Sequence, residues 1–469
     1  MKSWARRTAE LHGELRAIAE PDVMWWLLAG GVAAVELRGA EGAYVLSDAT
    51  PPGDTFIGYR DPRPITIDDA IARARAAATA LRELDGQLPG QPLCVTLGNP
   101  APTSAHGAVT VKSQLDVAAF AIGDRCVIGK LDDPQLREQL AAAVSGASPP
   151  PWHGSTPFVC VSIGDDKLET CRHAHRRAWR NGAGPWLGLG RASDGTQGAL
   201  ATITTCHLVV DGYGHARIAG RIAELMARAP ASTTPSLPLP ALCAVEGGIP
   251  LGVVWRELPH PSPRVLPLGY ALGRVLHQMA GHRDAKFSPT FQIPIAPGDR
   301  DDPMRNRRRA AASILSVRFE DGQPEPFDVF ATRARAILSR EASGHGLWTR
   351  SVAAARGMPG PLAWKRRSIG TSRARWLDRF AEVIGGRACL SKIAVDTPLP
   401  ASCAVSSPAR LATPRDPLGS CVLTILEDSS RSAITACGSG IAGTSAAADH
   451  LLDELLMLVS ASEPREAAI

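Results

Sequence analysis

Residues Ala199–Leu225, ALATITTCHLVVDGYGHARIAGRIAEL, form the stretch that decides the fold of this chain. It opens with an apolar, β-branched run over Ala201–Cys206, reaches His207, and turns at Asp211–Gly212. From Gly214 onward its apolar residues recur at helical spacing. The pattern predicts a strand, a sharp turn and a helix, with His207 at the end of the strand.

The polar residues of this stretch suggest a division of roles. A histidine at a strand end is held firmly by the sheet, and an imidazole suits proton removal from a hydroxyl, amine or thiol at neutral pH. His207 is therefore the leading candidate for a catalytic base. Asp211 lies past the bend, where it can pair with an arginine or accept backbone N–H bonds. Gly212 suits a backbone conformation or close approach that a side chain would obstruct. We interpret Asp211 and Gly212 as structural supports of the site.

Length and composition narrow the class of protein. A chain of 469 residues exceeds one ordinary core, so two domains or two fused halves are expected. The net charge of +5 allows an anionic ligand but does not require nucleic acid, and we expect none as a partner. The ten cysteines form no Cys-x-x-Cys pair and no zinc spacing, which favours free thiols and no bound metal, while their even number leaves disulfides as the alternative. The apolar run Val23–Val35 is too short to cross a bilayer. We therefore expect a cytoplasmic protein that does not bind membranes.

The proline-rich, uncharged segment APASTTPSLPLP is the clearest break in composition. It predicts a first half at 1–228 with the motif, a linker at 229–240, and a second half at 241–469. The elements predicted before the linker include helices at Ile67–Leu84 and Asp132–Ala143 and strands at Thr55–Tyr59, Leu93–Leu97, Ala108–Val111, Cys126–Ile128 and Phe158–Ile163. A glycine-rich loop is predicted at Asn181–Gly198. Those predicted after it are helices at Pro267–Gly281, Phe327–Arg340 and Ser445–Leu458, and strands at Thr290–Ile295, Ala312–Phe319, Ala388–Val395, Ala401–Val405, Cys421–Leu426 and Ser432–Ala436. This alternation predicts a layered α/β architecture.

The strand–turn–helix unit is predicted to occur twice. A shift of 230 residues places Cys437 under His207 and Ile441 under Asp211, and it superposes the following helices. Two related halves, of which only the first keeps His207 and Asp211, would form one site where they meet.

The segment CHLVVDGYGHARIAGRIAEL resembles the active-site segment of the chloramphenicol-acetyltransferase-like superfamily, which includes condensation domains and BAHD acyltransferases. The shared pattern is His-x-x-x-Asp-Gly, matched by His207, Asp211 and Gly212, while Cys206 stands where condensation domains usually carry a further histidine. The segment Phe291–Phe319, with Asn306, is similar to a second-half region of condensation domains.

This resemblance implies a pseudo-dimer of two α/β halves, each a two-layer sandwich, with a tunnel between them. It also implies an acyltransferase in which His207 deprotonates the hydroxyl or amine of a small-molecule acceptor. The donor would be acyl-CoA or the acyl-phosphopantetheine of a carrier protein, used as co-substrate without a permanently bound cofactor. We expect a monomer, because one chain supplies both halves. The alternatives are a non-catalytic condensation-like module that binds a carrier protein or recruits an enzyme, and another thioester reaction such as cyclisation or dehydration.

Further side chains are weaker candidates. Arg305, Arg307 and Arg308 could meet a CoA phosphate or an acidic carrier face, although a solvated loop is the simpler interpretation. His215 is interpreted as a surface or packing residue of the helix. Four serines near second-half strands are candidates for the hydroxyl that stabilises the oxyanion: Ser391, Ser402, Ser406 and Ser407.

Overall fold

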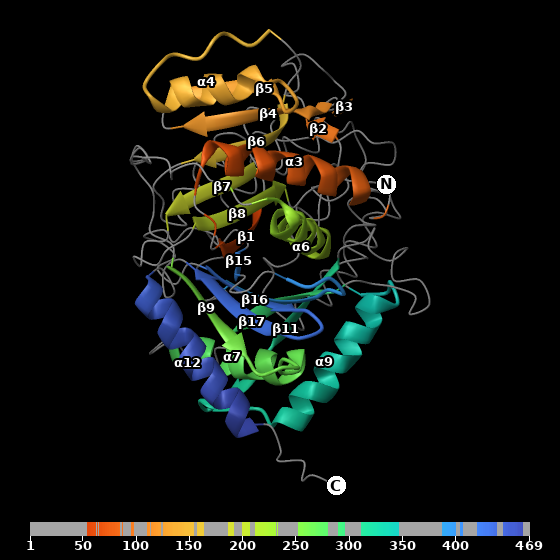
Figure 1. The fold of residues 1–469 in the computed structure, drawn as a ribbon. Helices are drawn as coiled ribbons and strands as arrows, with labels where there is room; N and C mark the ends of the chain where they lie inside the picture. Colours follow the sequence, from red (N-terminus) through yellow and green to blue (C-terminus); the bar gives the residue numbers. More distant parts are fainter. Residues whose placement is uncertain are drawn as a thin grey trace, which may run out of the picture.

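The computed structural model describes residues 54–61, 63, 65–84, 87, 95–97, 110–112, 114–122, 125–153, 157–163, 186–191, 199–206, 212–230, 232, 252–279, 289–295, 311–346, 387–399, 404–406, 420–438 and 444–462. These residues build two α/β units, one above the other in Figure 1. Each unit has one large mixed sheet with helices packed against it.

The first sheet has the order β15-β1-β8-β7-β6-β4-β5 among the described residues. Its strands are β1 (Asp54–Asp61), β4 (Gln114–Ile122), β5 (Arg125–Lys130), β6 (Pro157–Ile163), β7 (Trp186–Arg191), β8 (Ala199–Cys206) and β15 (Ala404–Ser406). The helices packed on it are α3 (Ile67–Leu84), α4 (Gln135–Val144) and α6 (Gly212–Arg228). A separate short pair is formed by β2 (Val95–Leu97) and β3 (Thr110–Lys112).

The second sheet has the order β11-β10-β14-β16-β17-β9. Its strands are β9 (Gly252–Leu258), β10 (Thr290–Ile295), β11 (Ala311–Ser316), β14 (Arg387–Ala394), β16 (Ser420–Glu427) and β17 (Ser432–Gly438). Its helices are α7 (Val265–Met279), α9 (Phe327–Ala342) and α12 (Ser445–Ser462), and a small hairpin of β12 (Phe319–Glu320) and β13 (Gln323–Pro324) precedes α9.

The two sheets repeat one topology. The order β5-β4-β6-β7-β8-β1 corresponds strand for strand to β11-β10-β14-β16-β17-β9. In both, the successive pairs run antiparallel, parallel, parallel, antiparallel and antiparallel. Helices follow at equivalent places, with α3, α4 and α6 matching α7, α9 and α12. The predicted architecture of two related α/β halves is confirmed.

The structure corrects the offset between the copies. β8 and β17 begin at Ala199 and Ser432, and α6 and α12 begin at Gly212 and Ser445, so both pairs of starts differ by 233 residues. The predicted shift of 230 was derived from weak letter-by-letter similarity, whereas the element starts fix the register. The position equivalent to His207 is therefore 440, not Cys437.

The predicted loop at Asn181–Gly198 is also wrong, because β7 occupies its centre. Gly188 and Gly190 lower the strand propensity of this segment. In the sheet, however, β7 is hydrogen-bonded on both sides, parallel to β6 and antiparallel to β8. The hydrogen bonds that β7 makes with the strands on both of its sides outweigh the low strand propensity of its two glycines. The prediction likewise contained no strand at β4 or β9.

Strand β15 links the two units. Although it follows β14 in the chain, it pairs antiparallel with β1 of the first sheet, with Phe56 opposite Ser406. The segment Val395–Leu399, which leaves β14, buries Val395 and Leu399 in the core of the first unit. We call Val395–Leu399 the crossover segment. Figure 1 shows β15 at the edge of the first sheet, next to strands β16 and β17 of the second.

Candidate functional site

The two residues that bracket the motif are both described. Cys206 ends β8, where its backbone pairs with Asp54 of β1, and Gly212 begins α6. His207 and Asp211 lie between them, outside the described residues. The motif segment is thus tethered to a central strand of the first sheet on one side and to α6 on the other.

Gly212 is pressed against the second half. A side-chain carbon at this position would lie 2.7 Å from Cδ1 of Ile393 on β14. Van der Waals contact needs more than 3.4 Å, so a side chain at Gly212 would have to displace Ile393. The neighbour of Gly212 is a residue of the second half that sequence patterns do not indicate.

The rest of α6 lies alongside the crossover segment. A carbon added at Gly220 would lie 3.1 Å from the carbonyl oxygen of Pro398, and Tyr213 Oη donates a hydrogen bond to Asp396 Oδ1 at 3.3 Å. Two glycines on one helix therefore let the second half approach closely. The start of α6 is therefore positioned by both halves.

Asp428 anchors the far end of the crossover segment. Its carboxylate accepts hydrogen bonds from the backbone N–H groups of Leu399 at 2.9 Å, Ser430 at 2.7 Å and Arg431 at 2.8 Å. Burial opposes ionisation of Asp428, but these hydrogen bonds outweigh it and lower its pKa. Arg431 also donates to the carbonyl oxygen of Leu399.

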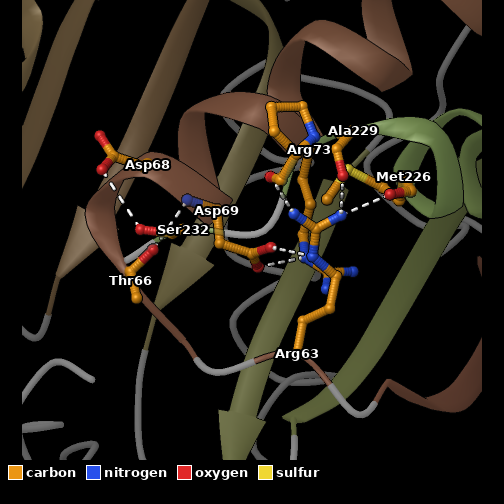
Figure 2. A network of polar contacts seen from close by, with 9 residues as sticks. Arg63, Thr66, Asp68, Asp69, Arg73, Met226, Ala229 and Ser232 are labelled. Atoms are coloured by element: carbon orange, nitrogen blue, oxygen red, sulfur yellow. Dashed lines mark hydrogen bonds and ion pairs between the residues drawn. The ribbon is translucent and has the colours of Figure 1, made fainter. Parts of the chain in front are cut away.

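The C-terminal end of α6 is fixed by the polar network in Figure 2. Arg63 donates from its guanidinium to the carbonyl oxygens of Met226, Ala229 at 3.3 Å and Pro230 at 2.7 Å. The last carbonyls of a helix have no partner within the helix, so an arginine there satisfies them and favours the helix dipole.

A buried carboxylate holds Arg63 in place. Asp69 pairs with Arg63 Nε at 3.1 Å and with Arg73 Nε at 2.8 Å, and the side chains of Asp69 and Arg73 are 1% and 2% exposed. The backbone N–H of Asp69 donates to Thr66 Oγ1 at 3.0 Å, which caps the start of α3. Nearby, Ser232 donates to Asp68 Oδ2 at 3.3 Å, so the first residues of the predicted linker lie against α3.

Other predicted candidates fall into three groups. Arg305, Arg307, Arg308 and Asn306 lie outside the described residues, as do Ser402 and Ser407. His215 is fully buried in α6, which agrees with a packing role rather than a helix-surface one. Ser391 lies half-buried on β14, two residues before Ile393. Within the described ranges no group of three or more His, Cys, Asp or Glu could hold a metal ion.

No protein-family model matches the chain, and no curated protein matches its sequence. Solved structures do match it. Its structural neighbours include an acetyltransferase and a condensation domain. A trichothecene 15-O-acetyltransferase from Fusarium sporotrichioides is 11% identical, with a TM-score of 0.42 over 92% of this chain and 93% of the other. F. sporotrichioides TRI101 in complex with coenzyme A and T-2 is 13% identical, with a TM-score of 0.42 over 88% and 94%. The starter condensation domain of the rhizomide synthetase is 10% identical, with a TM-score of 0.38 over 92% and 94%.

The fold of this chain is defined by its two repeated sheets. Among the helices described, none is both long and apolar enough to cross a membrane.

Proposed function

We propose that this protein is an acyltransferase. It would move an acyl group from the thioester of coenzyme A or of a carrier protein to a hydroxyl or amine of a small-molecule acceptor. The observation that carries the proposal is the contact of Gly212 with Ile393, because it brings the end of a His-x-x-x-Asp-Gly motif to the junction of two related α/β units. A site shared by two units can bring donor and acceptor together from different sides, which is what a transfer reaction requires.

In this proposal His207 is the general base. It takes the proton of the acceptor, which attacks the thioester carbonyl, and the thiol leaves after it is reprotonated. The step needs no metal and no covalent acyl-enzyme. The supports of the motif would keep the imidazole in place, since α6 is fixed at its start by Ile393 and at its end by Arg63.

Asp211 is proposed to support the turn as the N-cap of α6. Its counterpart at the 233-residue offset is Thr444, whose Oγ1 accepts a hydrogen bond from the backbone N–H of Ala447 at 3.1 Å at the start of α12. Aspartate is a favoured N-cap residue, because its carboxylate accepts the same bond.

The proposal is tested by incubating the protein with a panel of acyl-CoAs and acyl-carrier proteins and measuring loss of the acyl group by mass spectrometry. Acyl loss that depends on enzyme and acceptor supports it. Binding of a carrier protein with no acyl loss from any donor would instead favour the non-catalytic module.

A further inference from the structure

Helix α6 and strand β1 lie side by side and have matching lengths. The eight residues of β1 and the seventeen residues of α6 each span about 24 Å. β1 begins opposite Cys206, the last described residue before the motif, and Arg63 follows two residues after its end at Asp61. Arg63 contacts the C-terminal end of α6, whereas the motif segment joins β8 to the start of α6. The motif and Arg63 are therefore attached to opposite ends of one helix.

Arg63 uses every nitrogen of its guanidinium group at the C-terminal end of α6 (Figure 2). Nη1 donates hydrogen bonds to the carbonyl oxygens of Met226 and Ala229. Nη2 donates to the carbonyl oxygen of Pro230, and Nε pairs with the carboxylate of Asp69. A guanidinium group is planar and rigid, so it holds these partners at fixed positions relative to one another. Arg63 thereby sets where α6 ends along its own axis.

The carboxylate that holds Arg63 is fixed in the interior. Asp69 lies in the first turn of α3 with a side chain only 1% exposed, and it also pairs with Arg73, which is 2% exposed. Buried ion pairs are costly to desolvate, and apolar side chains of the same volume often stabilise a fold equally well. The charges add direction, because hydrogen bonds require defined distances and angles whereas apolar contacts do not. This cluster therefore suits the placement of α6 better than it suits simple stabilisation.

A displacement of α6 at its C-terminal end reaches its start. An α-helix is hydrogen-bonded along its whole length, and close-packed interiors transmit strain. The face of α6 toward the sheet is held by apolar side chains such as Ile218 and Ile222, whose contacts have no preferred direction. Gly212 begins α6 and directly follows Asp211, so an axial shift of the helix carries the end of the motif with it.

We propose that Arg63 is a positioning residue for the His207–Asp211 segment, which it places by fixing the axial position of α6; this inference rests on the proposed function. About 21 Å of helix separates Met226 from Gly212, so Arg63 acts through α6 and not by contact with the reacting groups. A displacement of about 1 Å at a reacting group can lower a rate by about 10²-fold. Loss of Arg63 is therefore expected to slow the chemical step and to leave donor binding unchanged.

Hydrogen–deuterium exchange of the full-length protein tests the placement without any substrate. Arg63→Met should raise the exchange rate of the peptide that contains His207 and the first turn of α6 by about tenfold, the share of hydrogen bonds to a charged group. Exchange in α4, which belongs to the same half, should stay at the wild-type rate. Arg63→Lys keeps the charge but not the planar fork, so its effect should be intermediate.

The matched control is Arg333→Met in the second half. Arg333 also pairs with a carboxylate, that of Glu325, and donates to a backbone carbonyl, that of Ser316, at 2.7 Å. Its loss should leave exchange at the motif unchanged. Wild-type exchange at the motif in Arg63→Met would overturn the inference. A rise spread evenly over the first half would also overturn it, because that result indicates a loss of stability alone.

The second readout is steady-state acyl transfer at a temperature where every variant is folded. Arg63→Met should lower kcat by about 10- to 10²-fold and leave KM for the donor within about twofold, whereas Arg333→Met should keep the wild-type kcat. A wild-type kcat in Arg63→Met would overturn the positioning role and leave the proposed function standing. A wild type that transfers from no donor would overturn the proposed function, and the exchange experiment would then decide by itself whether Arg63 places the motif.

Discussion

Cδ1 of Ile393 occupies the space that a side chain at Gly212 would fill, because a Cβ atom added to Gly212 would lie only 2.7 Å from it. The two residues come from different halves, 181 positions apart in the sequence, and they meet at the start of α6. This contact makes the packing of the second half a determinant of the geometry of the motif.

Gly212→Ala should destabilise the protein by about 1 kcal/mol, at the low end of the cost of overpacking, because the atom that must move is the terminal methyl of Ile393. Without the contact, replacing glycine by alanine in a helix would raise the free energy of unfolding by up to about 1 kcal/mol. Ile393→Val removes the conflicting methyl, so the double variant should recover most of the loss. Urea unfolding of the two single variants and the double variant measures this coupling. Strictly additive effects would show that the two residues do not compete for space.

Asp69→Ala should cost about 3–5 kcal/mol of unfolding free energy, because it leaves Arg63 and the buried Arg73 without their carboxylate. Asp68→Ala, one residue earlier, is the matched control. Asp68 pairs with Arg137 at 3.0 Å between partly exposed side chains, so its loss should cost about 0–1 kcal/mol. Equal losses in urea unfolding would contradict the central role given to Asp69.

Asp211→Ala should destabilise the protein by about 1 kcal/mol, as should Thr444→Ala in the second copy. Asp211→Asn should cost much less, since asparagine caps helices equally well. Thermal unfolding of the three variants decides between the N-cap and the predicted ion pair with an arginine. If Asp211→Asn is as damaging as Asp211→Ala, the negative charge is required and the N-cap role is wrong.

Glu427 should give the protein acid-sensitive stability. Burial opposes its ionisation, but hydrogen bonds from the side chain and backbone of Ser262, together with Lys392 at 3.2 Å, lower its pKa from 4.5 to about 2. A lowered folded-state pKa stabilises the fold above the unfolded-state value, and this contribution disappears as the pH falls from about 4.5 to about 2.

Glu427→Gln should therefore cost about 1.5–3 kcal/mol at pH 7, the contribution of hydrogen bonds to a charged group. The difference from wild type should shrink as the pH falls below 4.5. Urea unfolding at pH 7, 5 and 3 measures it. A difference that stays constant across this range would show that ionised Glu427 is not responsible.

Local signals predicted much of the fold. The bounds of α3 follow from Asp68 and Asp69 in its first turn and from the polar and glycine residues after Leu84, and they agree with the structure. β10 also agrees, because Thr290–Ile295 is a compact apolar run. The strand and the helix beside the motif follow from local signals too: β8 is an apolar, β-branched run, and α6 has apolar residues at helical spacing.

Features that depend on distant pairing were not predicted. β7 is a strand because two neighbours pair with it, and β15 belongs to the first sheet although it follows β14. Arg63 finds its acceptors more than 160 residues away, at the end of α6.

The most direct test of the central claim is the rate of acyl loss catalysed by His207→Ala, measured by mass spectrometry with the donor and acceptor that the wild type uses best. Loss of a general base predicts a rate about 10²–10⁴-fold lower, with an unchanged melting temperature and unchanged affinity for coenzyme A. A His207→Ala protein that transfers acyl groups at the wild-type rate would contradict the proposed mechanism.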